Sequence, residues 1–185
     1  LNIRPVNNRL LKVKSSTTVS DAFLWRTDNG FRTKFKYSDI LHLFYKIKNS
    51  FIEIHIYSNK NKLLKIERFT DLNLSNEFEI TSQSLGGLKD YGVFYIYHFT
   101  DKKLSHDDII SNRCYLGYSK NNNLYSFVHG NTLAKFTNIN KNNKYSSNIV
   151  KTSLFKNQNY TIQKLFDNFD NNELFFSNPT SKILR

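Results

Sequence analysis

The single cysteine of the chain and a histidine close to it are the residues whose types most directly indicate chemistry. Cys114 and His129 lie in the segment RCYLGYSKNNNLYSFVHG, residues 113–130, which alternates like two strands around a run of asparagines. A thiolate beside an imidazole is the arrangement of a cysteine nucleophile and its general base. A two- or four-residue turn places Cys114 opposite His129, whereas a three-residue turn shifts the register by one and separates them.

The residues around this pair do not complete a catalytic set. No glycine-rich elbow or hydrolase signature surrounds Cys114, and a lone cysteine on a strand usually acts as a small buried apolar residue. Glu77 and Glu79 share a strand face, but no further group in the sequence converges on them. We therefore expect a protein that is not an enzyme, with an enzyme that uses Cys114 and His129 as the alternative.

Histidines and aspartates are scattered along the chain and are not spaced as metal ligands. The nearest approach to a cluster is His98, His106, Asp107, Asp108 and His129, which lacks H-E-x-x-H or C-x₂-C spacing. The sequence also contains no glycine-rich phosphate-binding loop. We expect neither a metal nor a cofactor.

Aromatic residues interspersed with cations form the most informative candidate site. The Asn29-Gly30 dipeptide between two alternating segments predicts a hairpin with a type I′ turn, because that turn needs positive φ at both central residues. Such a hairpin places the rings of its first strand beside the cations of its second, on one face. Residues 113–130 add further rings within a stretch, residues 109–166, that contains no acidic residue. The candidate ligand-binding residues are Phe23, Trp25, Arg32, Lys34, Lys36, Tyr115, Tyr125 and His129.

Rings among cations suit two classes of ligand. Bases of single-stranded nucleic acid stack on rings while lysines follow the phosphates. Sugars stack their C–H faces on rings while cations meet acidic substituents. The chain lacks any recognised nucleic-acid-binding signature, so an acidic polysaccharide or other polyanion is favoured over nucleic acid.

The net charge of +12 agrees with an anionic partner. Lysines outnumber arginines 20 to 7, however, and this excess is also typical of AT-rich genomes. Dedicated phosphate-binding proteins favour arginine, whose planar guanidinium makes bidentate contacts. The leading hypothesis is a non-enzymatic binding module, and the alternative is a structural protein that forms homo-oligomers through its strand edges.

Short alternating segments predict a mainly β protein. Residues 51–57 alternate cleanly, residues 62–69 and 77–80 read as strands, and residues 92–99 are apolar on both faces, as expected of a covered central strand. Residues 38–48 have helical spacing with Ser38 as the candidate cap. Many short strands with few helices indicate an antiparallel β-sandwich, or an open barrel, with one or two short helices.

Composition divides the chain into four parts. Residues 1–19 carry four basic residues and no acid and form a basic arm or edge strand, and residues 20–138 form the β-sandwich domain. Residues 139–148 are an Asn-rich linker. Residues 149–185 form a strand-helix-strand segment, with its helix over 161–169, that packs on the sandwich or starts a second module.

The remaining features concern the compartment. The single cysteine excludes an intramolecular disulfide. No apolar run is long enough to span a membrane. The first residues do not resemble a signal peptide, which favours the cytoplasm but leaves the compartment open.

Overall fold

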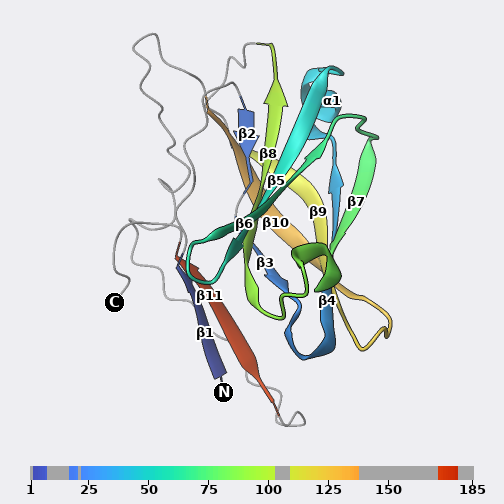
Figure 1. Ribbon diagram of the computed structural model, residues 1–185. Coiled ribbons are helices and arrows are strands. Elements are labelled where there is room, and N and C mark those ends of the chain that lie inside the picture. The colour runs from blue at the N-terminus through green and yellow to red at the C-terminus, as the bar shows by residue number, and fades with distance from the viewer. Residues whose placement is uncertain (1, 8–16, 21, 103–108, 138–170, 179–185) are drawn as a thin grey trace.

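The described part of the chain is built almost entirely from β-strands, as the sequence predicts. A computed structural model describes residues 2–7, 17–20, 22–102, 109–137 and 171–178 (Figure 1). For residues 7, 109–113, 130–137 and 176–178 it describes the backbone alone. The strands form a β-sandwich-like fold with one α-helix, and this confirms the predicted fold class.

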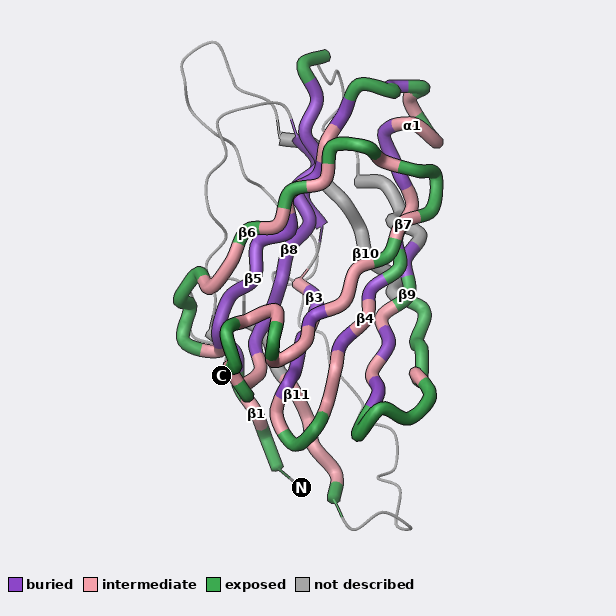
Figure 2. Tube along the Cα trace, turned by 45° about the vertical axis from the view of Figure 1, so that its right-hand side comes forward, coloured by how far each residue is buried: buried purple, intermediate pink, exposed green. Residues whose placement is uncertain are grey.

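The first layer of the sandwich is centred on two long antiparallel strands, β5 (Ser50–Ser58) and β8 (Tyr91–Thr100). Strand β6 (Leu63–Phe69) pairs with the outer edge of β5. Two short strands, β2 (Thr17–Val19) and β3 (Phe23–Arg26), follow one another along the other edge of β8. Burial is continuous along β8 after Tyr91, whereas the residues of β6 alternate between intermediate and exposed (Figure 2).

The second layer contains β10 (Ser126–Thr137), β9 (Ile109–Lys120), β4 (Phe31–Ser38) and β7 (Ser75–Ile80), in that order. All neighbouring strands in it are antiparallel. Strand β2 pairs with both β8 and β10, so it joins the two layers into one folded sheet of nine strands. The end strands of this sheet are β6 and β7.

Aromatic and branched side chains fill the space between the layers. The alternating residues Ile52, Ile54 and Ile56 of β5 all point into this core, as predicted from their spacing. Phe35 of β4 is at its centre, with its ring 4.4 Å from that of Phe23. The other face of β8 is buried in a second apolar cluster, whose members are Val6, Val19, Tyr57, Val93, Tyr95, Tyr97 and Phe99. Both faces of β8 are therefore covered, as its sequence predicts.

The predicted short helix is present as α1 (Ile40–Tyr45), between β4 and β5. Its N-cap is Asp39, whose carboxylate accepts a hydrogen bond of 3.0 Å from the backbone N–H of His42. The prediction that Ser38 caps the helix is wrong, because Ser38 still belongs to β4 and pairs with Ser75. The helix ends at Lys46, which adopts a left-handed conformation.

The two ends of the described chain pair with each other. Strand β1 (Asn2–Asn7) lies parallel to β11 (Glu173–Asn178) in a separate two-stranded sheet (Figure 1). The predicted linker, residues 139–148, and the predicted helix over 161–169 lie outside the described residues. The four-part division of the chain therefore stays a prediction.

The Asn29-Gly30 turn has the predicted backbone but does not make the predicted hairpin. Asn29 and Gly30 have φ values of +51° and +77°. Strand β3 nevertheless pairs with β8, and β4 pairs with β7 and β9. The connection crosses between the layers, and at the crossing the Arg26 N–H donates to Thr33 Oγ1 at 2.9 Å. The prediction that the rings of β3 and the cations of β4 share one face of a hairpin is therefore wrong.

Candidate functional site

The hairpin of β9 and β10 adopts the register that separates Cys114 from His129. Cys114 lies opposite Gly130, and His129 lies opposite Tyr115. The connection runs through Asn121 and Asn122, which both have positive φ. Cys114 is fully buried in the core, while His129 is exposed on the outer face of the sheet. This register therefore does not bring together the nucleophile and the base that the enzyme alternative requires.

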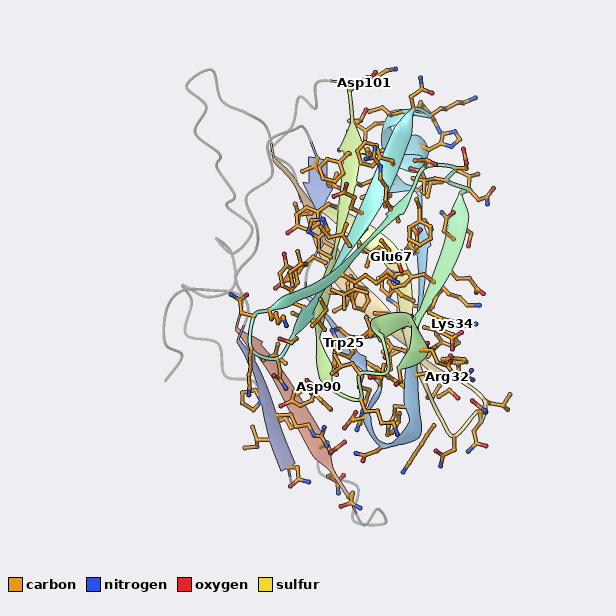
Figure 3. The ribbon with its side chains drawn as sticks, in the orientation of Figure 1. Trp25, Arg32, Lys34, Glu67, Asp90 and Asp101 are labelled. Atoms are coloured by element: carbon orange, nitrogen blue, oxygen red, sulfur yellow. The ribbon has the colours of Figure 1, made fainter. Side chains whose placement is uncertain are left out.

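Trp25 and Phe23 are buried in the core and do not share a surface with the cations of β4. Trp25 has no exposed surface, and its indole Nε1–H donates to the carbonyl oxygen of Tyr57 at 2.8 Å. Phe23 is 4% exposed and packs on Phe35. Because β3 pairs with β8, both rings turn inward and lie apart from the other predicted ligand-binding residues. Arg32 and Lys34 lie at the far side of the second layer from Trp25 (Figure 3).

The outer face of β7, β4, β9 and β10 carries three neighbouring rows of side chains, which we name the striped face. Carboxylates come from β7, cations from β4, and rings from the β9–β10 hairpin. This order follows from the strand register, because Lys36 lies between Glu77 and Tyr115, and Tyr115 lies beside His129. The striped face comprises Glu77, Glu79, Arg32, Lys34, Lys36, Tyr115, Tyr125, Phe127 and His129.

Each cation of the middle row has a carboxylate close by. Glu77 lies between two ammonium groups, 3.6 Å from Lys34 Nζ and 3.4 Å from Lys36 Nζ. The charge of Lys34 and the hydrogen bond from Lys36 hold the pKa of Glu77 below its usual value. Arg32 Nε lies 3.4 Å from Glu79. The expectation that nothing converges on the two glutamates is wrong, because β7 pairs with β4 and brings the cations to them.

The same cations also lie over the rings. Lys34 Nζ is 4.9 Å from the centroid of the Tyr125 ring, and Lys36 Nζ is 5.3 Å from that of Phe127. These distances are those of cation–π contacts. The ring of Phe127 lies over Gly117, because a Cβ atom at that position would come within 2.5 Å of it. Gly117 thus leaves the space in which Phe127 approaches the cation row.

The rings of the striped face differ in how firmly they are held. The hydroxyl of Tyr125 donates a hydrogen bond to Glu79, and burial together with this bond raises the pKa of Tyr125. Tyr115 and Phe127 are 48% and 38% exposed. The ring of Tyr115 meets that of His129 edge-on at 5.2 Å. Two rings are therefore presented to solvent beside a row of paired charges.

The structure brings together most of the predicted site residues and adds three that were not among the predicted ligand-binding residues. Arg32, Lys34, Lys36, Tyr115, Tyr125 and His129 share the striped face. The three additions are Glu77, Glu79 and Phe127. The alternation E-F-E in residues 77–79 places both glutamates on one face, but nothing in the sequence says which strand pairs with them.

A second polar cluster lies inside the molecule beneath α1. His98 Nε2 lies 2.9 Å from Ser50 Oγ and 3.4 Å from Asp39 Oδ1. Burial lowers the pKa of His98 to about 3, so the ring is neutral at physiological pH and its contact with Asp39 is not an ion pair. Both partners approach the same ring nitrogen, so this is not the relay of a catalytic triad, in which each nitrogen has its own partner.

Metal-binding and membrane-spanning features can be judged for the described residues. No group of three or more His, Cys, Asp or Glu side chains among them could hold a metal ion. His106, Asp107 and Asp108 lie outside the described residues. None of the helices in the described segments is long and apolar enough to cross a membrane.

Comparison with known proteins returned no significant similarity to a family model, to a curated protein or to a solved structure. The function must therefore be inferred from the striped face itself.

Proposed function

We propose that this protein is a non-enzymatic binding module that holds a glycan on the striped face. The observation that carries the proposal is the exposure of Tyr115 and Phe127, at 48% and 38%, on a sheet face whose other side chains are mostly charged. Exposed rings within a polar surface are typical of sites that recognise a partner.

The chemistry of the three rows matches that of a sugar. A pyranose ring has a C–H face that packs on an aromatic ring, and an edge of hydroxyl groups that both donate and accept hydrogen bonds. Tyr115 and Phe127 supply the rings, the carboxylate of Glu79 accepts hydrogen bonds, and Lys36 donates them. Rings and hydrogen-bonding groups thus lie side by side at the scale of one or two sugar residues.

A glycan is favoured over nucleic acid because the cations are already paired. Proteins that follow a phosphate backbone gain affinity by releasing counterions from it, and this requires cations that are free to neutralise phosphates. On the striped face Arg32 pairs with Glu79, and Lys34 and Lys36 share Glu77. A phosphate backbone that follows the whole cation row would also have to displace Glu79, which the Tyr125 hydroxyl holds beside Arg32, so single-stranded nucleic acid is the less favoured ligand.

The two exposed rings provide the test of this function. We expect Tyr115→Ala and Phe127→Ala each to weaken binding to polysaccharides about tenfold, because each removes a stacking surface. Affinity electrophoresis against neutral and acidic polysaccharides, with single-stranded DNA in parallel at low ionic strength, measures the effect. Val128→Ala is the matched control, because Val128 is 58% exposed and is the neighbour of Phe127 on the same strand. Absence of polysaccharide binding, or equal binding by all variants, contradicts the proposal.

The edge of β6 supports self-association as a second candidate function. In the described part of the chain β6 pairs with β5 alone, and Leu63 and Ile66 on it are 37% and 45% exposed. Open edges of this kind pair with further strands. Lys65, Glu67 and Arg68 place charges on the same strand, which opposes such pairing. Light scattering distinguishes the two candidates, since a stable oligomer supports self-association and a strict monomer excludes it.

A further inference from the structure

The two carboxylates of the striped face are held in different ways. Glu79 receives a hydrogen bond from the Tyr125 hydroxyl and lies beside Arg32, with 30% of its side chain exposed. Glu77 is held by the flexible ammonium groups of Lys34 and Lys36, and 54% of its side chain is exposed. Movement of Glu79 would break its hydrogen bond with Tyr125 and its ion pair with Arg32. Movement of Glu77 breaks only its ion pairs with Lys34 and Lys36.

Ion pairs of this exposed kind stabilise a protein very little, because water solvates both partners well and the side chains lose entropy when they pair. A carboxylate from solution can replace Glu77 at low cost, since the same two ammonium groups receive it. The exchange is favoured further by charge, because two lysines here share one carboxylate and the whole chain carries a net charge of +12.

The rings place a sugar carboxylate at this position. Lys36 Nζ lies 5.3 Å from the centroid of the Phe127 ring. Since the ammonium already lies over Phe127, a sugar packs on the neighbouring exposed ring of Tyr115, which lies opposite Lys36 in the strand register, and brings an acidic group on its rim within reach of that ammonium. Lys34, whose Nζ also approaches Glu77, lies beside Lys36 in the same row.

We infer that the ligand is an acidic glycan of the uronic acid class, and that its carboxylate takes the place of Glu77 between Lys34 and Lys36. This inference rests on the proposed function, because it requires the ligand to lie on the striped face. Glu77 then acts as an internal competitor that lowers the affinity for acidic sugars and disfavours weakly bound anions.

The test compares two glutamate variants that change the net charge equally. Glu77→Gln removes the competitor. Glu67→Gln is the matched control, because Glu67 lies on β6 with 38% of its side chain exposed and pairs with Lys65 Nζ at 2.5 Å, away from the striped face (Figure 3). The probes are oligosaccharides of galacturonate, alginate and hyaluronate, each with its neutral methyl ester, and a sulfated carrageenan oligosaccharide. Titration calorimetry gives the affinities.

We expect the unmodified protein to bind at least one uronate more tightly than its ester, and Glu77→Gln to bind that uronate about fivefold more tightly still. Glu67→Gln should differ little from the unmodified protein. Equal affinity for acid and ester, equal effects of the two variants, or a preference for the sulfated probe would overturn the inference.

Failure of this inference is distinguishable from failure of the proposed function. If neutral esters bind and Tyr115→Ala weakens them, the striped face still binds glycans but the acidic ligand is wrong. If none of the probes binds, or if Tyr115→Ala and Phe127→Ala bind every probe as the unmodified protein does, both proposals fail together.

Discussion

At the scale of single residues, two glycines show how the buried and exposed rings are placed. A Cβ atom at Gly92 would lie 2.0 Å from the carbonyl oxygen of Tyr57 and 2.9 Å from Trp25 Nε1. A Cβ atom at Gly117 would meet only the Phe127 ring among its nearest atoms. Gly92 therefore makes room for rigid backbone beside Trp25, while Gly117 makes room for a side chain that can move.

This difference predicts that Gly92→Ala mainly lowers stability and that Gly117→Ala mainly weakens glycan binding. Gly92→Ala should lower the free energy of unfolding by about 3 kcal/mol, because backbone must shift to accept the methyl group. Gly117→Ala should change it by less than about 1 kcal/mol and should weaken glycan binding, because Phe127 is displaced from the striped face. Urea denaturation measures the first effect and affinity electrophoresis the second. Equal loss of stability in the two variants contradicts this account of the glycines.

At the scale of elements, strand positions could be predicted from the sequence and strand partners could not. The alternation of β5 and the apolar faces of β8 are local patterns, and both strands lie where those patterns indicate. The partner of β3 depends on whether Phe23 and Trp25 gain more by burial against β8 than by pairing with β4, and no local pattern records this balance. The same limit explains why the contacts of Glu77 and Glu79 were missed.

The β9–β10 hairpin shows the same limit within one element. The sequence left two registers open, because a run of three asparagines, Asn121 to Asn123, permits turns of different length. The structure selects the register that faces Cys114 inward and Tyr115 outward. A shift of one residue in this register would exchange the inward and outward faces of one strand relative to the other. The same register therefore separates Cys114 from His129 and places Tyr115 beside His129 on the outer face.

The buried contact between His98 of β8 and Asp39, the N-cap of α1, predicts a dependence of stability on pH. Burial lowers the pKa of His98 from 6.5 to about 3, so the unfolded chain binds more protons in this range and stability falls as the pH decreases below 6.5. His98 alone should account for a loss of about 1.4 kcal/mol between about pH 7.5 and 5.5. Burial raises the pKa of Asp39, which has the opposite sign and offsets part of this loss as the pH approaches the folded-state pKa of Asp39.

Urea unfolding of His98→Asn at both pH values isolates the contribution of the histidine. The variant should lose less stability on acidification than the unmodified protein, by about the 1.4 kcal/mol assigned to His98. If both proteins lose the same amount, His98 is not neutral and buried as described.

At the scale of the whole molecule, a cluster of charges ties the β1–β11 sheet to the sandwich. Arg26 Nη1 of β3 lies 2.7 Å from Glu173 of β11, and Arg4 Nη1 of β1 lies 2.6 Å from Asp28. Arg26 also pairs with Asp28 at 2.8 Å, and Arg4 pairs with Glu173. Although burial raises it, hydrogen bonds from Arg26 and Arg4 hold the pKa of Asp28 below its usual value. These largely buried contacts attach both ends of the described chain to the same corner.

Glu173→Gln should loosen this attachment. We expect a loss of about 2 kcal/mol in the free energy of unfolding, because the arginines keep their charge and lose one carboxylate. Hydrogen exchange should accelerate in residues 2–7 and 173–178 and stay unchanged in β5 and β8. The exposed pair of Glu67 provides the control, since Glu67→Gln should cost no more than about 0.5 kcal/mol. Uniform acceleration of exchange across the sandwich would show that the cluster does not act locally.

The central claim is that the ligand binds the striped face and not the buried surface around Trp25. The chain has one tryptophan, so its indole N–H gives one resonance in a nitrogen–proton correlation spectrum. We predict that titration with the tightest-binding uronate oligosaccharide shifts the amide resonances of Lys36, Tyr115 and Phe127 and leaves the Trp25 indole resonance in place. Shifts confined to Phe23, Trp25 and their neighbours, or no shifts along β4, β9 and β10, would contradict the account.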